Sequence, residues 1–328
     1  MILAGDIGGT KTNLALFDQA VTQAPRFERH YLNRGQHSFI DMVRHFLWDS
    51  GAQPHAACFA VAGPIKDGRC AMPNLPWVID VGAIREAIKI EQVALINDVE
   101  ATAHGIFTLS PEQLMAINPG TPDSTGNKAL IAAGTGLGEA ILFRDGGHYR
   151  VSPSEGGHTD FAPRTEEELA LLRFLWTQFG HVSCERLVSG PGLANIYDYL
   201  CFAGHPEEPR PVAERIAGAA DRSAAIARAA IDGESPRCGR ALEWFISVYG
   251  AEAGNLALKA LATGGVYIGG GIAPKVAANM TDGQFMRAFR DKGRLSEMLS
   301  AVPVMLVLEP KTALRGAAAW AENNRLTA

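Results

Sequence analysis

Two short glycine-rich turns constrain the fold of this chain more than any other feature of its sequence. The first covers residues 5–11, and the second covers residues 134–138. Each turn contains a threonine and lies between two short apolar segments that are typical of β-strands. We therefore predict two β-hairpins built to one plan, which is a faint internal repeat. A duplicated fold would place the two turns on opposite walls of one cleft.

Further strand-like segments alternate with helix-like ones, which favours an α/β architecture. The apolar residues 57–62 and 93–96 are typical of buried strands, as are 266–268 and 302–308. An alanine-rich segment, 315–323, predicts a helix near the C-terminus. No Pro/Ser-rich linker separates the halves, so we expect domains that interleave through chain crossings.

One helix start is well marked. Thr165 and Glu168 match a capping box, in which each side chain accepts a hydrogen bond from the backbone of the other residue. Apolar residues then recur at helical spacing as far as Trp176, and Gly180 is expected to end the helix. We interpret the acidic run 166–168 as a helix start and assign it no catalytic role.

The first turn has the chemistry of a phosphate-binding loop. Glycines leave room for an anion close to the backbone and tolerate positive φ, and consecutive N–H groups can form an anion-binding nest. A hydroxyl donor and a cation follow, and the aspartate can hold Mg²⁺ through water. The pattern is neither the GxxxxGK[ST] P-loop nor GxGxxG before a helix, so an ordinary glycine-rich hairpin is the alternative. The candidate nucleotide-binding residues are Gly5, Asp6, Ile7, Gly8, Gly9, Thr10 and Lys11, with Asp6 as the metal candidate.

Two later glycine segments are candidates for binding the same nucleotide. Gly134, Thr135 and Gly136 form the second turn, which alone would be explained as a tight turn but gains weight from the duplicated frame. Gly270 and Gly271 follow a strand-like segment and are candidates for a wall against adenine or ribose. The alternative for these two glycines is a strand-to-helix turn. Together with the first turn, these residues predict an ATP site.

Polar residues that follow a predicted strand are candidates for catalysis. Asn97 and Asp98 come directly after the strand 93–96, and ligands of open α/β sheets bind at the carboxyl ends of the strands. Phosphoryl transfer to a hydroxyl needs an acceptor for the hydroxyl proton, which Asp98 can be. Asn97 offers a donor and an acceptor to a sugar hydroxyl. The alternative for this pair is a helix cap.

A second polar segment contains Glu155 and His158, separated by two glycines. The glycines disfavour the helix that a metal-binding Glu-x-x-His motif requires. We interpret the segment as a loop whose carboxylate and imidazole contact adjacent sugar hydroxyls, the alternative being a surface loop. Glu185 precedes Arg186 and, taken alone, is a helix-start acid or an arginine partner.

The composition indicates an ordinary globular chain. Of its 328 residues, 47% are hydrophobic and 20% are charged, which is enough apolar material for a sizeable core. The net charge of −5 argues weakly against nucleic acid or an anionic membrane as a partner. Neither a transmembrane segment nor a signal peptide is recognisable. Five scattered cysteines without a CxxC pair favour a reducing cytoplasm over a disulfide frame or a zinc cluster.

The glycine loops resemble those of the superfamily that contains actin, sugar kinases and the Hsp70 ATPase. More closely, the chain resembles the bacterial glucokinases over nearly its full length and in the order of that family's motifs. The stretches that carry the resemblance are GDIGGT from Gly5, the pair Asn97-Asp98, AAGTGLGEA from Ala132, SEGGHTDFAP from Ser154, CERLVSGPG from Cys184 and GGGIAP from Gly269.

The resemblance implies an actin-like α/β fold of two ribonuclease H-like lobes with a central cleft. We expect a small lobe of residues 1–108, completed by 309–328, and a large lobe of 109–308. The implied activity is ATP-dependent phosphorylation of glucose at the 6-hydroxyl, with Mg²⁺. A cytoplasmic homodimer that binds neither nucleic acid nor membrane is the expected form.

The resemblance also assigns roles to the polar residues. It gives the catalytic base to Asp98, within the sugar-binding pair Asn97-Asp98. It gives glucose contacts to Glu155, His158 and Glu185.

Two other classes of protein share parts of this pattern. The ROK family of kinases and repressors has a similar first loop, but its repressors carry a DNA-binding domain before the loop. Many ROK members also have a zinc cluster of closely spaced cysteines after Glu-x-Gly-His, whereas here Cys184 stands alone after His158. A non-enzymatic ATP-driven module of the actin or Hsp70 type would not need Glu155, His158 and Glu185. ATP turnover at a rate unaffected by any sugar would favour such a module.

Overall fold

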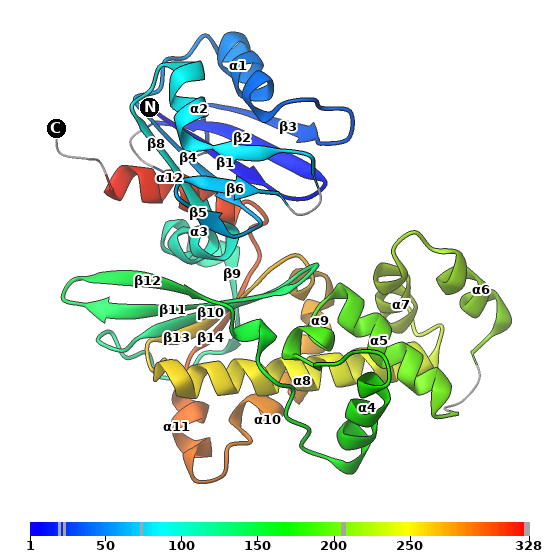
Figure 1. Cartoon of the computed structure of the whole chain (residues 1–328). Coiled ribbons are helices and arrows are strands. Elements are labelled where there is room, and N and C mark those ends of the chain that lie inside the picture. The colour runs from blue at the N-terminus through cyan, green and yellow to red at the C-terminus, as the bar shows by residue number, and fades with distance from the viewer. Residues whose placement is uncertain (19–20, 22–23, 73–74, 205–207, 325–328) are drawn as a thin grey trace. The chain divides into compact units, whose positions relative to one another are not determined.

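The chain divides into two compact units. The computed structural model describes residues 1–324 apart from 19–20, 22–23, 73–74 and 205–207. Unit 1 comprises Met1–Leu114 and Glu309–Ala328, and unit 2 comprises Met115–Leu308 (Figure 1). The division into lobes after residue 108 and before residue 309 stays a prediction, because compact packing units need not coincide with folding domains.

Unit 1 is built on a five-stranded sheet with the strand order β3-β2-β1-β4-β8 (Figure 1). The strands are β1 (Ile2–Ile7), β2 (Lys11–Phe17), β3 (Phe27–Leu32), β4 (Ala56–Val61) and β8 (Gln92–Asn97). The first three strands form an antiparallel meander, whereas β4 and β8 continue parallel to β1. The predicted hairpin around the first glycine turn is therefore confirmed, as are the strands predicted at 57–62 and 93–96.

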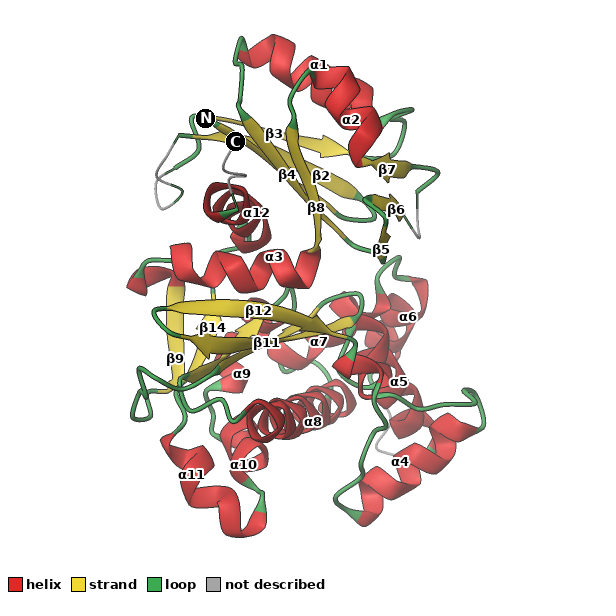
Figure 2. Cartoon of the chain, turned by 60° about the vertical axis from the view of Figure 1, so that its left-hand side comes forward, coloured by secondary structure: helices red, strands yellow, loops and turns green. Residues whose placement is uncertain are grey.

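Helices cover both faces of this sheet, which explains why its central strands are apolar on both sides. One face packs on α1 (Phe39–Ser50) and α2 (Val81–Ile88) through residues such as Leu3 and Phe59, and the other packs on α12 (Thr312–Asn323) through residues such as Ala4. Figure 2 shows these layers from the side. The remaining elements are α3 (Asp98–Gly105) and the small sheet of β5 (Ile65–Lys66), β6 (Arg69–Ala71) and β7 (Val78–Asp80).

The predicted C-terminal helix is α12, and its alanine-rich sequence is explained by its contact with α3. A Cβ atom at Gly316 would lie 1.7 Å from the carbonyl oxygen of Ala101. Small residues are needed at this contact because the two helix backbones touch. The helix begins three residues earlier than predicted, at Thr312.

Unit 2 is built on a six-stranded sheet with the order β12-β11-β10-β13-β14-β9 (Figure 1). The strands are β9 (Leu114–Asn118), β10 (Lys128–Ala133), β11 (Leu137–Asp145), β12 (His148–Ser154), β13 (Gly265–Gly269) and β14 (Val304–Val307). An antiparallel meander is again followed by two parallel strands. The faint repeat in the sequence is thus a repeat of strand topology, with β9 as an addition.

A long helix, α8 (Pro236–Ala260), is the core element of unit 2 and buries residues such as Phe245 and Tyr249 (Figure 2). It packs against α10 (Gln284–Arg290) through glycines: a Cβ atom at Gly250 would lie 2.3 Å from the carbonyl oxygen of Phe285. The other helices of this unit are α4 (Glu166–Trp176), α5 (Gly190–Phe202), α6 (Arg210–Gly218), α7 (Arg222–Ile231), α9 (Ala277–Met280) and α11 (Ser296–Ala301).

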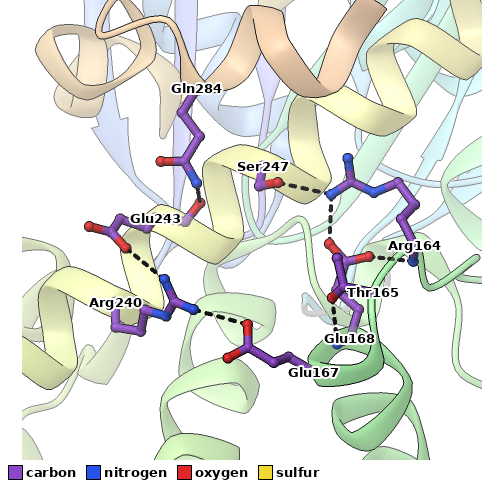
Figure 3. Close-up of polar contacts among 8 residues, drawn as sticks. All are labelled: Arg164, Thr165, Glu167, Glu168, Arg240, Glu243, Ser247 and Gln284. Carbon is purple, nitrogen blue, oxygen red and sulfur yellow. Dashed lines mark hydrogen bonds and ion pairs between the residues drawn. The ribbon is translucent and has the colours of Figure 1, made fainter. Parts of the chain in front are cut away.

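The helix predicted after Thr165 is α4, but two details of the prediction are wrong. The Thr165 hydroxyl accepts from the Glu168 backbone N–H as expected, at 3.1 Å. The Glu168 carboxylate instead accepts from the backbone N–H and the guanidinium of Arg164, both at 2.6 Å, so only half of the capping box forms (Figure 3). The helix ends at Trp176, before Gly180, and the Thr177 hydroxyl donates to the Phe174 carbonyl at this end.

None of the helices in the described part of the chain combines the length and the apolar character needed to cross a membrane.

The close contact between α8 and α10 predicts opposite effects for two alanine substitutions in α8. Gly250→Ala should destabilise the protein by about 1–3 kcal/mol, because the new methyl group overlaps the Phe285 carbonyl. Gly239→Ala, in the same helix, meets nothing within 4 Å and should stabilise by up to about 1 kcal/mol, since alanine is the better helix former. Chemical denaturation measures both changes. Equal effects of the two substitutions would contradict the packing described here.

Candidate active site

The first glycine turn, in unit 1, is tethered by a buried asparagine that follows β3. The turn closes with a 3.0 Å hydrogen bond from the Gly8 N–H to the Lys11 carbonyl. Asn33, 3% exposed, donates from its amide to the Gly8 carbonyl and from its backbone to the Thr10 carbonyl, both at 2.9 Å. Its own side-chain oxygen accepts from the Thr12 hydroxyl at 2.8 Å. Thr10 and Lys11 themselves are exposed, so the turn is fixed while its functional side chains face solvent.

The glycines of this turn do not use the positive φ that glycine tolerates. Neither Gly8 nor Gly9 is among the glycines with positive φ. The single closing hydrogen bond is made with backbone angles that any residue can adopt. A Cβ atom at Gly8 would lie an ordinary 3.5 Å from the Lys11 carbonyl, so packing within the chain does not require glycine there. At Gly5 it does, because a Cβ atom would lie 2.5 Å from the Phe59 ring.

Asp6 has the surroundings expected of a carboxylate that holds a cation. It lies in β1 opposite Asn13 of β2, whose amide donates to it at a long 3.4 Å. Burial raises the pKa of Asp6, and the Asn13 hydrogen bond opposes this only in part. A buried carboxylate with one long hydrogen bond is poorly compensated. Asp6 therefore fits a role in holding Mg²⁺, directly or through water.

Asn97 and Asp98 lie at the same edge of the sheet as the first turn. Asn97 pairs with Val61, and Val61 pairs with Ile7 at the end of β1. Ile7 itself is fully buried, so only its backbone can contact a ligand. The strands end together here, as expected for ligand sites in parallel sheets.

The Asn97 side chain is the N-cap of α3, so half of the alternative interpretation is right. Its oxygen accepts from the backbone N–H groups of Val99 and Glu100, at 2.9 and 3.4 Å. We predicted both a donor and an acceptor for sugar at Asn97; only its amide N–H remains for that purpose. Asp98 is the first residue of α3 and also accepts from the Val99 N–H, at 2.9 Å. After burial, the charge of Asp98 is the second cause that raises the pKa of the nearby Cys70 thiol.

The second glycine turn, in unit 2, is held at both ends by the segment 184–192. The Gly134 carbonyl accepts from the Gly190 N–H at 2.8 Å, and the Glu185 carboxylate accepts from the Leu137 N–H at 3.0 Å. A Cβ atom at Gly136 would lie 2.6 Å from the same carboxylate oxygen. Glu185, predicted as a sugar ligand, thus also positions the turn predicted to bind phosphate, a contact that sequence reasoning missed.

Glu155 and His158 lie in a single 3-10 turn (Gly156–His158), in agreement with the predicted loop. Their side chains are 89% and 60% exposed, and their nearest charged atoms are 3.9 Å apart. The turn packs closely on the second glycine turn, since a Cβ atom at Gly157 would lie 2.1 Å from the Leu137 carbonyl. Unit 2 therefore gathers the predicted sugar residues around Leu137.

Gly270 and Gly271 lie beside the second glycine turn. Gly270 has φ +86°, and a Cβ atom there would lie 2.2 Å from the Ala133 carbonyl, so this position requires glycine on both grounds. The segment leads into a 3-10 helix (Ala273–Val276), as the alternative interpretation expected. Next to this segment, the buried Tyr249 hydroxyl accepts a hydrogen bond from the Ala133 N–H at 3.2 Å and lies 3.4 Å from the Gly269 carbonyl. Tyr249 thereby ties α8 to the ends of β10 and β13.

A buried carboxylate lies directly behind the Glu155–His158 turn. Glu139 of β11 is 1% exposed, and one of its oxygens would lie 2.0 Å from a Cβ atom at Gly156. Its other oxygen has no hydrogen-bond partner among the described residues. Burial, followed by the negative charge of Glu252, raises the pKa of Glu139 to about 7, while Lys259 opposes the shift. Glu139 therefore keeps its proton in the lower part of the neutral range.

This raised pKa predicts how stability depends on pH. The folded state holds the Glu139 proton more tightly than the unfolded chain, whose glutamates have a pKa near 4.5. The contribution of this group is therefore most favourable below about pH 4.5, declines as the pH rises to about 7 and then levels. Glu139→Gln cannot ionise, so above pH 7 it should be more stable than the unsubstituted protein by up to about 3 kcal/mol.

The control for this measurement is Glu297→Gln, at an exposed position of α11. Denaturant unfolding from pH 4 to pH 8 compares the three proteins. A pH dependence of Glu139→Gln that parallels the unsubstituted protein would show that folding does not change the pKa of Glu139.

The fold and the site together define a class of protein. The two sheets repeat one strand order. Each sheet has a glycine turn between the first two strands of its meander, and candidate polar site residues lie at the same edge of the sheet. This is the duplicated fold of the actin-like ATPases, in the variant used by sugar kinases.

Comparison with known proteins gives the family. The family model described as Glucokinase matches residues 3–324. A glucokinase of Trichormus variabilis is 40% identical over 334 residues, covering 97% of this chain and 98% of the relative. The crystal structure of a glucokinase from an Antarctic psychrotroph is 34% identical, with a TM-score of 0.85 and coverage of 98% and 99%. A ROK family glucokinase from Streptomyces griseus, in complex with glucose and AMPPNP, shares the fold at 19% identity and a TM-score of 0.67, over 98% of this chain and 99% of that one.

The chain belongs to the glucokinase family, which confirms the family predicted from the sequence. It is an ATP-dependent kinase that phosphorylates glucose. A non-enzymatic ATP-driven module is thereby excluded, and the family match is to the glucokinases and not to a ROK repressor.

Proposed function

We propose that this enzyme transfers the γ-phosphoryl group of ATP to the 6-hydroxyl of glucose, with Asp98 as the base that accepts the hydroxyl proton. The bond between O6 and the γ-phosphorus forms as the bond from that phosphorus to the β–γ bridging oxygen breaks, giving glucose 6-phosphate and ADP. The observation that supports this assignment most directly is the shared sheet edge in unit 1. There, Asn97 ends β8 and Asp98 follows it, two strands away from the glycine turn that follows β1.

Asp98 is suited to accept a proton because of its place at the start of a helix. Its position in the first turn of α3 puts the carboxylate near the positive end of the helix dipole, which favours its charged form. The Val99 N–H donates to one of its oxygens at 2.9 Å, which fixes the rotamer. The Asn97 amide, oriented by its capping bonds, can donate to a neighbouring sugar hydroxyl.

The nucleotide contacts are assigned to the two glycine turns and to the glycines after β13. Thr10 and Lys11 supply a hydroxyl and a cation to the phosphates, and Thr135 supplies a second hydroxyl. The first turn has no Cβ atoms at Gly8 and Gly9, so phosphate oxygens can approach its backbone. Gly270 and Gly271 are assigned to the wall beside the nucleoside.

Asp6 is the residue that would hold Mg²⁺. When bound, Mg²⁺ neutralises phosphate charge and draws electron density from the transferring phosphoryl group. The raised pKa of Asp6 in the metal-free chain fits a group whose charge is balanced by a cation. A cytoplasmic location and a homodimer complete the proposal, and both are supported by resemblance to the bacterial glucokinases.

The sugar contacts are assigned to Glu155, His158 and Glu185. The first two are exposed and adjacent in one turn, so a carboxylate and an imidazole can meet neighbouring hydroxyls. Glu185 has a second task, because its carboxylate holds the Leu137 N–H of the second glycine turn. Sugar and nucleotide sites are therefore linked through one side chain.

Asp98→Asn should lower kcat by about 10² to 10⁴, the usual contribution of general-base assistance. Asn has nearly the same shape and caps a helix equally well, so glucose affinity measured by titration should change little. If Asp98 served only the helix terminus, kcat would stay near that of the unsubstituted enzyme. A variant that keeps more than roughly a tenth of kcat would remove Asp98 from the role of base.

Alanine substitutions should separate contact with the sugar from the positioning of the second glycine turn. Glu155→Ala and His158→Ala should raise the glucose KM roughly 5- to 150-fold, because a buried sugar hydroxyl loses a partner worth about 1–3 kcal/mol, while the ATP KM changes less. Glu185→Ala should raise both KM values, since the second glycine turn loses its tether. Steady-state kinetics with each substrate varied gives the comparison. Normal glucose affinity in all three variants would refute the assignment.

Removal of divalent metal should abolish activity. EDTA would strip Mg²⁺ from the phosphates, and excess Mg²⁺ should restore the rate fully, because the described residues contain no group of three or more His, Cys, Asp or Glu side chains arranged to hold a metal ion. Metal analysis of the purified protein is the matching measurement. Stoichiometric zinc that survives chelation would contradict the proposal.

A further inference from the structure

Unit 2 has a polar hollow whose residues have no role in the assignments above. It is an open hollow of about 700 Å³ between the start of α4, one face of α8 and the helix α10. We call it the arginine hollow, and its charged lining residues are Arg164, Arg240, Glu243, Arg287, Arg290 and Asp291. Four guanidinium groups border one space, which is an unusual concentration of a single charged group.

Two of these guanidinium groups are held in place by the protein. The Arg164 guanidinium donates to Glu168 at 2.6 Å and to the Ser247 hydroxyl at 2.9 Å. The Arg240 guanidinium bridges Glu167 of α4 and Glu243 of α8, at 2.9 and 3.3 Å (Figure 3). These contacts orient the two planar groups before any ligand arrives, so little side-chain entropy remains to be lost on binding.

The other two guanidinium groups, on α10, are not held by the contacts that fix Arg164 and Arg240. Arg287 and Arg290 are three residues apart on α10 and so project from the same side of the helix. Within the described part of the chain, neither forms an ion pair. Burial, followed by the charge of Arg164, lowers the pKa of the neighbouring Lys292, while Glu252 and Asp291 oppose the shift. An anion in the hollow would relieve the repulsion among these groups.

The acceptors in the lining narrow the class of ligand. Glu243 and Asp291 also face the hollow, so a long polyanion would meet carboxylates as well as guanidinium groups. Carboxylates and serine hydroxyls accept hydrogen bonds from alcohols, while arginine forks match phosphate oxygens in pairs. The volume lies within the usual range of small-molecule sites, about 300–1,000 Å³.

We propose that the arginine hollow binds a small phosphate ester that also carries hydroxyl groups, as a sugar phosphate does. Its phosphate would lie between Arg287, Arg290 and the fixed guanidinium groups, with hydroxyl groups toward Glu243 and Asp291. The site is built from α4, α8 and α10 and shares no residue with the candidate active site.

Calorimetric titration with glucose 6-phosphate tests this proposal. The enzyme is first saturated with glucose and AMPPNP, so that the active site is filled and any saturable binding is outside it. Arg287→Ala/Arg290→Ala should weaken the affinity at least roughly 10-fold, since two charge-assisted hydrogen bonds are lost. Inorganic phosphate should bind more weakly than the ester, because it has no alcohol groups to donate to the carboxylates.

The matched control is Arg150→Ala/Arg173→Ala, which removes the same charge from two exposed positions outside the hollow. Its affinity for glucose 6-phosphate should equal that of the unsubstituted enzyme. Both double variants should keep their circular dichroism spectra and full kinase activity without the probe, since none of the four arginines belongs to the candidate active site. Absence of saturable binding, or equal weakening in the two double variants, would overturn the proposal.

Discussion

The hydrogen bond from the Leu137 backbone N–H to the Glu185 carboxylate is the contact on which the candidate site of unit 2 depends. It joins a glycine turn to a segment almost fifty residues away (|i−j| = 48). It also explains why position 136 is glycine, because the carboxylate occupies the space of a Cβ atom. The Glu155–His158 turn packs on the carbonyl of the same Leu137, so one residue contacts both the second glycine turn's tether and the turn proposed to bind sugar.

In unit 1, a different residue holds the glycine turn in place. Its glycine turn is held by Asn33, which contacts the carbonyls of Gly8 and Thr10 from the end of β3. The strand order of the two sheets is the same, yet one turn is tethered by a neutral amide and the other by a carboxylate. The neutral tether adds no negative charge to the turn that we propose to bind phosphates. The carboxylate of unit 2 is the one that we propose to contact sugar hydroxyls as well, so the two halves would differ in chemistry on the same strand order.

The predictions that succeeded from the sequence rest on local patterns. The hairpin strands, the strand before Asn97 and the helix after Thr165 are each encoded by neighbouring residues, through apolar periodicity, glycine and capping side chains. The predictions that failed concern geometry set by distant segments. Nothing near Asn33, Tyr249 or Glu139 in the sequence indicates that each reaches a site loop, because the partner lies in another strand or helix. The sequence also does not show why Gly8 is glycine, because its φ is not positive and glycine can also serve to leave space beside a ligand.

The account predicts that ATP is consumed only when a sugar 6-hydroxyl is present to receive the phosphoryl group. The direct measurement follows ADP and sugar phosphate together, with glucose and with 6-deoxyglucose, which differs only in that hydroxyl. With glucose, ADP and glucose 6-phosphate should form in equal amounts; with 6-deoxyglucose, no phosphorylated sugar should appear. Phosphorylation of 6-deoxyglucose, or ADP formation at the same rate without any sugar, would contradict the account.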